Sequence, residues 1–166
     1  MRPKSYHSGI AARTGGRGFT LVEMIVVLAL IGILAGIAVP AFDSIIARTR
    51  LSTAANDVLL GLNVARSEAV RRNATVYFCL ADAGGRWSVH QVAGDEIREG
   101  ALPPSITADT NNLDTGLLAD FACVRYRPDG LAYGAGSVLM TNGEITLTLG
   151  TSSRVVNVRT GGTYVG

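Results

Sequence analysis

A charge-free apolar segment near the N-terminus limits what this chain can fold into. It runs from Met24 to Phe42, 19 of the 166 residues. A helix of that length is about 28 Å long at about 1.5 Å per residue, close to the hydrocarbon thickness of a bilayer. Glu23 immediately precedes the run. A carboxylate at membrane depth is energetically costly, and such a residue usually has a charged partner and a function. The sequence therefore predicts a membrane-inserted helix with a functional acid at its start.

The residues before this helix are basic and contain no acid. Four basic residues precede the apolar run, namely Arg2, Lys4, Arg13 and Arg17. Such a leader holds an N-terminus in the cytoplasm. A cleaved secretory signal would place its apolar stretch before a small-x-small site, whereas here the run follows Gly18. The alternative, an ordinary single-pass anchor, leaves Glu23 unexplained.

The hexapeptide Gly18-Phe19-Thr20-Leu21-Val22-Glu23, followed by Met24, resembles the processing motif of type IV pilins and of the pseudopilins of type II secretion. The resemblance implies that a membrane-embedded aspartyl prepilin peptidase cleaves after Gly18 and methylates the new N-terminus at Phe19. It also implies that Glu23 pairs with the free amine of Phe19 on a neighbouring subunit. A buried carboxylate needs a positive partner of this kind.

Two further features of the apolar helix suit a subunit that leaves the membrane for a filament. Pro40 removes a backbone hydrogen bond, which predicts a helix kink near the membrane exit. Gly32 and Gly36 form a G-x-x-x-G pattern, which permits close approach of two helices. General flexibility of an apolar helix is the alternative for the two glycines.

An amphipathic pattern continues the helix past Pro40. Apolar residues recur there at three- and four-residue spacing: Leu51, Ala55, Val58, Leu62, Ala65 and Ala69. This periodicity predicts one helix from about Phe19 to Arg72, whose second half packs on a soluble head. Asn73-Ala74 is expected to end it.

Short β-type runs follow the helix. We expect strands at Thr75–Leu80, Arg86–Val92, Phe121–Tyr126, Ser137–Met140, Glu144–Leu149 and Arg154–Val158. Pro128-Asp129-Gly130 and Gly134-Ala135-Gly136 are expected to form turns, and Asn142-Gly143 predicts a hairpin. The stretch Ala93–Asp120 has little periodicity and is expected to be mainly an irregular loop.

The second half of the chain also resembles a narrower family, the GspH/FimT group of H-type minor pseudopilins and related minor type IV pilins. The resemblance rests on Val64–Asn73 followed by Val76-Tyr77-Phe78-Cys79, on Trp87, and on Tyr126–Gly130. It implies an α+β fold in which a long N-terminal helix packs on a small antiparallel β-sheet head. Residues 1–18 would be the leader, 19–42 the transmembrane and filament-core helix, and 43–166 the periplasmic head.

Cys79 and Cys123 are the two cysteines of the chain, and both lie in predicted strands. In an oxidising periplasm an isolated pair commonly forms a disulfide. The alternative is two separate small residues of the core. The spacing leaves the choice open, because pairing needs Cα atoms within about 7 Å.

Catalysis is not expected from this sequence. His90 is the single histidine after the leader, and a lone strand histidine is more often a surface or satisfied residue than a base. There is no Cys/His metal spacing, P-loop or nucleophile-elbow motif. Clustered oxygens between Asp109 and Asp114 suit a polar turn better than calcium, because an EF-hand glycine is missing. We therefore expect no cofactor, metal or small-molecule substrate.

The expected function is that of a non-catalytic minor pseudopilin, which helps to initiate or cap the pseudopilus of a type II secretion system. Its implied partners are the prepilin peptidase, other pilin or pseudopilin subunits and the bacterial inner membrane, with the N-terminus cytoplasmic and the head periplasmic. Minor type IV pilins in pilus assembly are the alternative.

DNA binding in natural transformation is a further alternative. The resemblance to the GspH/FimT group implies that such binding would use a basic C-terminal Gly-Arg-x-Arg element, but Gly162 stands where an arginine of that element would fall. Arg154 and Arg159 are the remaining candidates for a weak DNA or partner contact, so phosphate neutralisation would be weak. Without its leader the chain has 11 basic and 13 acidic residues, and we expect no nucleic-acid partner.

Overall fold

The computed structural model describes residues 18–81, 85–91, 95–115 and 120–166. The chain forms two compact units, residues 1–41 and 42–166. The predicted basic leader, with Arg2, Lys4, Arg13 and Arg17, lies outside the described residues.

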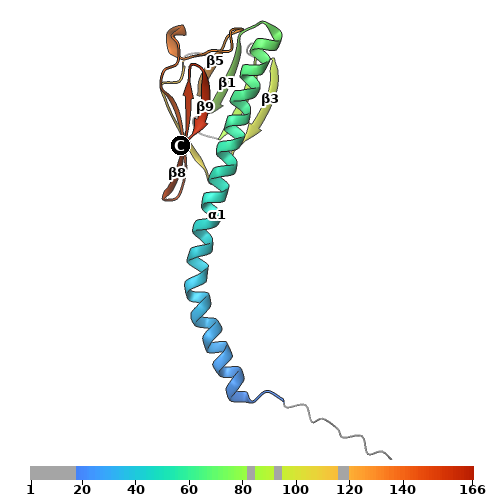
Figure 1. The fold of residues 1–166 in the computed structure, drawn as a ribbon, viewed down its shortest axis with the longest axis vertical. Helices are drawn as coiled ribbons and strands as arrows, with labels where there is room; N and C mark the ends of the chain where they lie inside the picture. The colour runs from blue at the N-terminus through green and yellow to red at the C-terminus, as the bar shows by residue number, and fades with distance from the viewer. Residues whose placement is uncertain (1–17, 82–84, 92–94, 116–119) are drawn as a thin grey trace, which may run out of the picture. The chain divides into compact units, whose positions relative to one another are not determined.

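The first unit contains the start of a long helix, α1, which extends from Leu21 to Arg72 (Figure 1). Residues 21–37 are all exposed, and the helix is long and apolar enough to cross a membrane. The backbone stays helical through Pro40, so this proline does not end the helix. The kink predicted at Pro40 stays a prediction.

In the second unit α1 presents one apolar face to the core. The six residues that define the amphipathic pattern are all buried, as predicted: Leu51, Ala55, Val58, Leu62, Ala65 and Ala69. The helix is followed by Asn73, whose φ of 49° is left-handed. The amides of Asn73 and Ala74 donate to the carbonyls of Val70 and Ala69 over 3.3 and 3.2 Å, which satisfies two of the last helical carbonyls.

The head contains two antiparallel sheets in place of the one expected. The first has the order β3 (Glu96–Ala101), β2 (Arg86–His90), β1 (Val76–Ala81), β5 (Phe121–Tyr126) and β6 (Ala132–Tyr133). The second has the order β4 (Thr107–Asn111), β7 (Gly143–Leu149), β8 (Ser152–Arg159) and β9 (Gly162–Val165). The α+β class and the antiparallel pairing are confirmed, and β5 has the predicted bounds.

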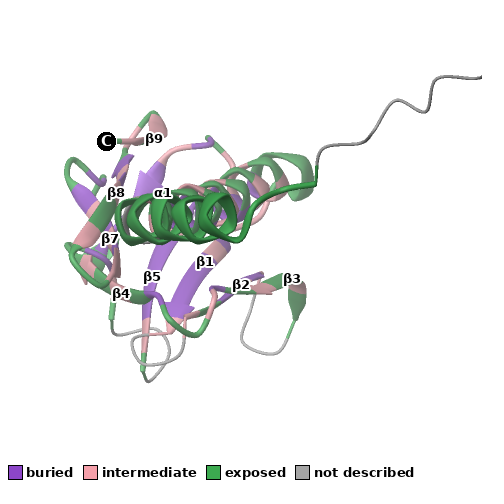
Figure 2. Ribbon diagram, turned by 90° about the horizontal axis from the view of Figure 1, so that it is seen from below, coloured by how far each residue is buried: buried purple, intermediate pink, exposed green. Residues whose placement is uncertain are grey.

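One hydrophobic core joins the helix to both sheets. Buried residues of β1 and β5 lie beneath α1 (Figure 2). Phe78 of β1 and Trp87 of β2 are buried side by side in this core, with ring centroids 5.9 Å apart. From the second sheet, Ile145, Leu147 and Val156 are fully buried.

Trp87 fits into this core because two glycines lie against its ring. A Cβ on Gly61 of α1 would come within 2.6 Å of the Phe78 ring and 3.0 Å of the Trp87 ring. A Cβ on Gly100, which is the β3 partner of Trp87, would come within 2.3 Å of the indole. Close packing against these rings therefore explains why glycine occupies both positions, although glycine in a helix or strand interior lowers stability.

Three strand predictions were wrong. The stretch Ala93–Asp120 contains β3 and β4 instead of an irregular loop. Ser137–Met140 forms no strand; a 3-10 turn, η1 (Ala135–Ser137), overlaps its start. Asn142-Gly143 does not close a hairpin, because β7 pairs with β4 and β8. β3 and β4 are edge strands whose side chains are largely exposed, so they lack the apolar alternation by which strands are recognised.

We expect Gly61→Ala to destabilise the head. Alanine favours a helix over glycine by about 1 kcal/mol, but its methyl group would overlap the buried rings of Phe78 and Trp87. Overpacking of this kind costs about 1–3 kcal/mol. Thermal unfolding of the full chain in detergent, followed by near-UV circular dichroism, should show a lower midpoint.

Asn63→Ala is the matched control, because Asn63 is an exposed position of the same helix. It should leave the midpoint equal or raise it slightly. A Gly61→Ala protein as stable as the Asn63→Ala protein would contradict the packing role of this glycine.

Candidate functional site

Gly18, Phe19 and Thr20 precede the first turn of α1 and are not helical. The Thr20 hydroxyl accepts a hydrogen bond of 3.2 Å from the amide of Glu23, and the Thr20 carbonyl accepts one of 3.2 Å from the amide of Met24. Thr20 is therefore the N-cap residue of α1. As a result, the peptide bond between Gly18 and Phe19 lies outside the helix.

The structure brings the predicted processing and docking residues together. Gly18, Phe19, Thr20 and Glu23 line one hollow of about 520 Å³. Phe19 is 74% exposed, and Glu23 is an exposed acid in the first turn of the helix. A negative charge is favoured at this end of a helix by the helix dipole.

Thr20 is the member of this group that was not predicted as a site residue from the sequence. The signal was present, because Thr20-Leu21-Val22-Glu23 fits the S/T-x-x-E pattern of a capping box.

Further along α1, a Cβ added to Gly32 or Gly36 would meet no atom of the described residues within 4 Å, the helix's own backbone apart. The surface at these two glycines is therefore open to another helix.

Cys79 and Cys123 are joined by a disulfide between the two adjacent strands β1 and β5 of the first sheet. The two residues face each other in the register of these strands, with Cα atoms 4.1 Å apart. The two cysteines are 44 residues apart in the sequence, and a bridge that closes a loop of that length is worth about 4 kcal/mol in the chain-entropy model. His90 is buried nearby, with its ring stacked on Tyr77 and Nδ1 3.5 Å from the Ser88 hydroxyl. Burial lowers the pKa of His90, although Glu96 opposes the shift.

Arg125 of β5 connects three segments of the head. Its Nη2 donates to Asp114 Oδ2 over 3.0 Å in a largely buried ion pair. Its Nη1 donates to the hydroxyl of Ser137 in η1, and its guanidinium lies 5.7 Å from the centre of the Tyr77 ring. The loop after β6 is thereby held to the face of the first sheet.

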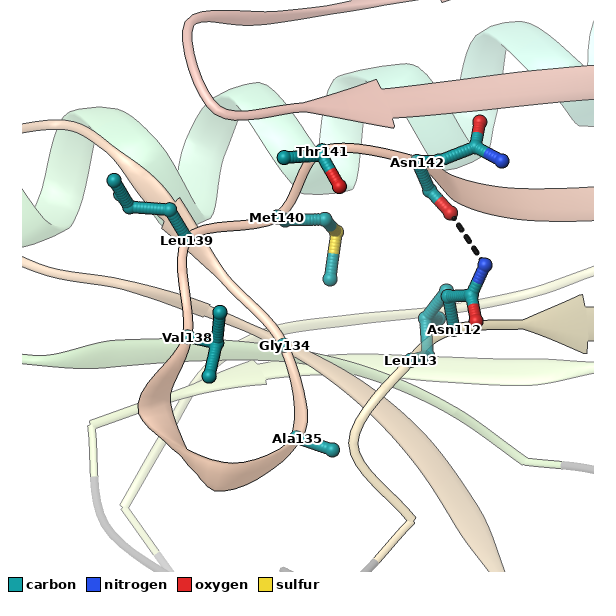
Figure 3. A pocket seen from close by; sticks show the side chains of 9 residues that line it. All are labelled: Asn112, Leu113, Gly134, Ala135, Val138, Leu139, Met140, Thr141 and Asn142. Carbon is teal, nitrogen blue, oxygen red and sulfur yellow. Dashed lines mark hydrogen bonds between the residues drawn. The ribbon is translucent and has the colours of Figure 1, made fainter.

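A hollow of about 480 Å³ lies beside this loop (Figure 3). Asn112 and Leu113 form one wall, and the loop residues Gly134, Ala135 and 138–142 form the rest. The Asn112 amide donates to the Asn142 carbonyl over 2.9 Å and connects the two walls. Val138 and Leu139 of the loop are exposed apolar residues beside the hollow.

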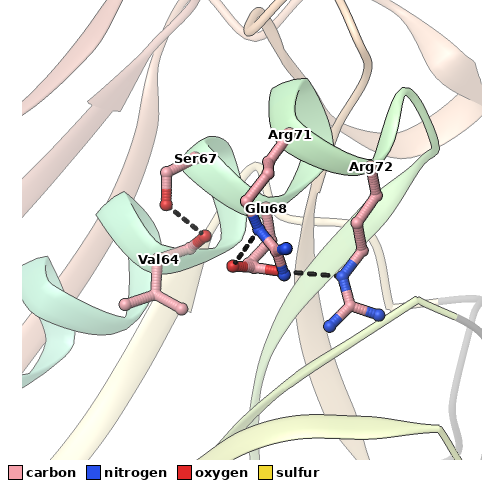
Figure 4. A network of polar contacts seen from close by, with 5 residues as sticks. All are labelled: Val64, Ser67, Glu68, Arg71 and Arg72. Carbon is pink, nitrogen blue, oxygen red and sulfur yellow. Dashed lines mark hydrogen bonds and ion pairs between the residues drawn. The ribbon is translucent and has the colours of Figure 1, made fainter.

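Charged side chains pair at the C-terminal end of α1 (Figure 4). Glu68 accepts hydrogen bonds from Arg71, at 3.0 and 2.6 Å, and from Arg72, at 2.7 Å. The bonds from Arg71, and then the bond from Arg72, lower the pKa of Glu68 from 4.5 to about 2. Arg66 instead reaches the β8–β9 turn, where Nη1 donates to the Gly161 carbonyl over 2.9 Å.

Arg154 and Arg159, the candidates for a DNA or partner contact, are both exposed in β8. They are five residues apart in a strand that pairs with β7 in unbroken register from Ser152 to Val158. Side chains of a strand alternate between its faces, so the two arginines point to opposite faces. The Arg159 guanidinium lies 5.7 Å from the centre of the Tyr164 ring on β9.

The arrangement of a long helix and an antiparallel head is a pilin fold. The type IV minor pilin FimU of Pseudomonas aeruginosa PAO1 aligns with 72% of this chain and 90% of its own, with a TM-score of 0.55 and 19% identity. The minor pseudopilin EpsH of Vibrio cholerae aligns with 70% of this chain and 96% of its own, with a TM-score of 0.52 and 9% identity.

Sequence matches identify the family. Residues 54–162 match the family model of the type II transport protein GspH, and residues 13–39 match the prokaryotic N-terminal methylation motif. The chain belongs to the GspH family.

Shorter matches connect it to fimbrial proteins. The fimbrial protein EcpC of Eikenella corrodens is 52% identical over 40 residues, which are 24% of this chain and 26% of EcpC. The type IV major fimbrial protein FimA of Dichelobacter nodosus is 56% identical over 36 residues, 22% of each chain. The chain thus spans about a quarter of the length of these relatives.

We expect the contribution of Glu68 to stability to be lost in acid. Because the pKa of Glu68 is lowered in the folded head, the ionised carboxylate stabilises the fold above about pH 4.5, and this effect declines as the pH falls toward 2. Thermal midpoints of the parent and Glu68→Gln proteins should differ at pH 7 and converge below pH 4.

Glu99→Gln is the matched control, since Glu99 is exposed on the edge strand β3. It should lower the midpoint at pH 7 less than Glu68→Gln does. A difference between parent and Glu68→Gln that stays constant from pH 7 to pH 2.5 would refute the role of the ionised carboxylate.

Proposed function

We propose that this chain is a non-catalytic minor pseudopilin that helps to initiate or cap the pseudopilus of a type II secretion system. The observation that carries the proposal is the combination, in one chain, of a GspH head with an N-terminal methylation motif. The motif opens a helix whose apolar side chains are exposed. Such a surface needs either lipid or neighbouring subunits to cover it.

The outward face of α1 supports assembly through helix packing. Thr49 and Thr53 are exposed on this face, but their hydroxyls donate to the carbonyls of Ile45 and Thr49, over 2.9 and 3.1 Å. Because these hydroxyl groups are satisfied within the helix, the face offers methyl groups and can pack against another helix without loss of hydrogen bonds. Leu60, about two turns further along the helix, is also exposed.

Glu23 supplies the docking interaction in this proposal. Cleavage after Gly18 creates a free amine at Phe19, and the same hollow holds Glu23. Within one subunit the cap interaction orders this end of the helix. Between subunits, the amine of one Phe19 would neutralise the Glu23 carboxylate of the next, so that neither charge stays unpaired in an apolar environment.

A minor type IV pilin in pilus assembly is the second candidate. The fold favours it as much as the first candidate, because FimU and EpsH align with similar TM-scores. Family membership is the observation that favours type II secretion. DNA uptake is less well supported, because Arg154 and Arg159 point to opposite faces of β8 and form no common phosphate-binding patch.

Gly18→Ala should leave an unprocessed precursor. The small residue before the cut lies in the non-helical segment ahead of the cap, and a Cβ there would meet no atom of the described residues within 4 Å, its chain neighbours apart. Loss of cleavage in the Gly18→Ala protein would therefore result from poorer recognition by the peptidase and not from misfolding of this chain. Immunoblots of cells that express the peptidase should show the longer form, and normal cleavage would contradict the proposed processing site.

Glu23→Ala should be processed but poorly incorporated into filaments. Removal of the carboxylate leaves the Phe19 amine of the neighbour without a partner in an apolar environment. Sheared filament fractions should contain clearly less of the variant than of the parent, while membrane fractions keep the mature subunit. Glu23→Asp is the matched control and should retain part of the incorporation. If the Glu23→Ala protein were incorporated as well as the parent protein, the pairing of Glu23 with the Phe19 amine would be excluded.

A further inference from the structure

The first two turns of α1 in the second unit carry an exposed apolar surface. Phe42, Ile45 and Ile46 are 62%, 58% and 47% exposed. At about 100° per residue they occupy an arc of about 100° on the helix. Leu51 and Val58, which pack into the head, point in roughly the opposite direction. The head therefore leaves this surface uncovered.

Two arginines flank the apolar surface. Arg48 and Arg50 are exposed, and neither forms an ion pair with any residue that the structure describes. By helical position they lie on either side of the arc formed by Phe42, Ile45 and Ile46. Asp43 is the single acid between residues 42 and 50, so two arginines against one aspartate leave one net positive charge.

The position of these residues along the helix matches the edge of a bilayer. Phe42 ends the charge-free run of 19 residues, which fills the hydrocarbon core at about 28 Å. Arg48 lies about 9 Å further along the helix and Arg50 about 12 Å. Helical side chains lean toward the helix N-terminus, which is here the membrane side, so the long stems bring the guanidinium groups back toward the headgroups.

We propose that the segment Phe42–Arg50 is a lipid-binding collar, in which Ile45 and Ile46 lie in the interfacial region and Arg48 and Arg50 bind anionic phospholipid headgroups. Guanidinium groups suit this role, because they pair with phosphate through two parallel hydrogen bonds. The collar fixes how far the helix emerges while the subunit waits in the membrane. This proposal rests on the proposed function, in which the subunit is anchored in the membrane before assembly. It adds that the anchored subunit binds anionic phospholipids.

Energy transfer to labelled lipids tests the collar in the full chain. Phe42→Trp places an indole at the collar, and the parent protein, measured in parallel, supplies the signal of Trp87 for subtraction. The protein is reconstituted in phosphatidylcholine nanodiscs with a trace of dansyl-labelled phosphatidylglycerol or dansyl-labelled phosphatidylcholine. One net positive charge near the surface should enrich the anionic lipid about fivefold around the indole, and high salt should reduce the enrichment.

Combined Arg48→Gln and Arg50→Gln substitutions should abolish the enrichment and, because Asp43 then leaves one net negative charge, bring transfer to the anionic lipid to or below that of phosphatidylcholine. Arg154→Gln with Arg159→Gln removes the same charge from the head and should leave the enrichment unchanged. Equal transfer before any arginine is replaced, or enrichment that survives loss of Arg48 and Arg50, would overturn the proposal. Near-UV circular dichroism confirms that each variant is folded. The measurement needs no filament, so its failure is distinct from a failure of the Glu23→Ala test.

Discussion

The head depends on the burial of one face of α1 against two sheets. Leu51, Val58 and Leu62 are fully buried there, and each such side chain contributes about 2 kcal/mol by removal from water. The small residues Ala54, Ala65 and Ala69 of the same helix are also buried. Small side chains allow the helix to lie close to β1 and β5, and the glycine at 61 leaves room for the rings of Phe78 and Trp87.

Because one face is fully used inside the subunit, the opposite face remains for contacts outside it. The exposed side chains Phe42, Ile45, Ile46 and Leu60 and the internally bonded hydroxyls of Thr49 and Thr53 give that face its apolar character. The same helix begins with a capped N-terminus at Thr20, which keeps the Gly18–Phe19 bond outside the helix and Glu23 in the first turn. We propose that processing, docking and head packing use different parts of this single helix.

The sequence was most informative where periodicity or a motif expresses a physical requirement. The helix from Leu21 to Arg72, its buried face and strand β5 follow from apolar spacing, and the grouping of residues 18–23 follows from a short motif. β3 and β4 could not be found in this way, because they are edge strands with exposed, polar side chains and are held by pairing with β2 and β7. The hairpin predicted at Asn142-Gly143 was wrong, because the long-range β4–β7 pairing outweighs a local hairpin preference. The contacts of Arg125 with Asp114 and Ser137 depend on tertiary structure and have no local signal.

We propose, above all, that the mature chain enters a filament through its processed N-terminus. Mass spectrometry of the N-terminal peptide from sheared and purified filaments tests this most directly. We predict a peptide that begins at Phe19 and carries one methyl group on its amine. Filaments that lack this chain, or that contain it with the leader still attached, would contradict the proposal.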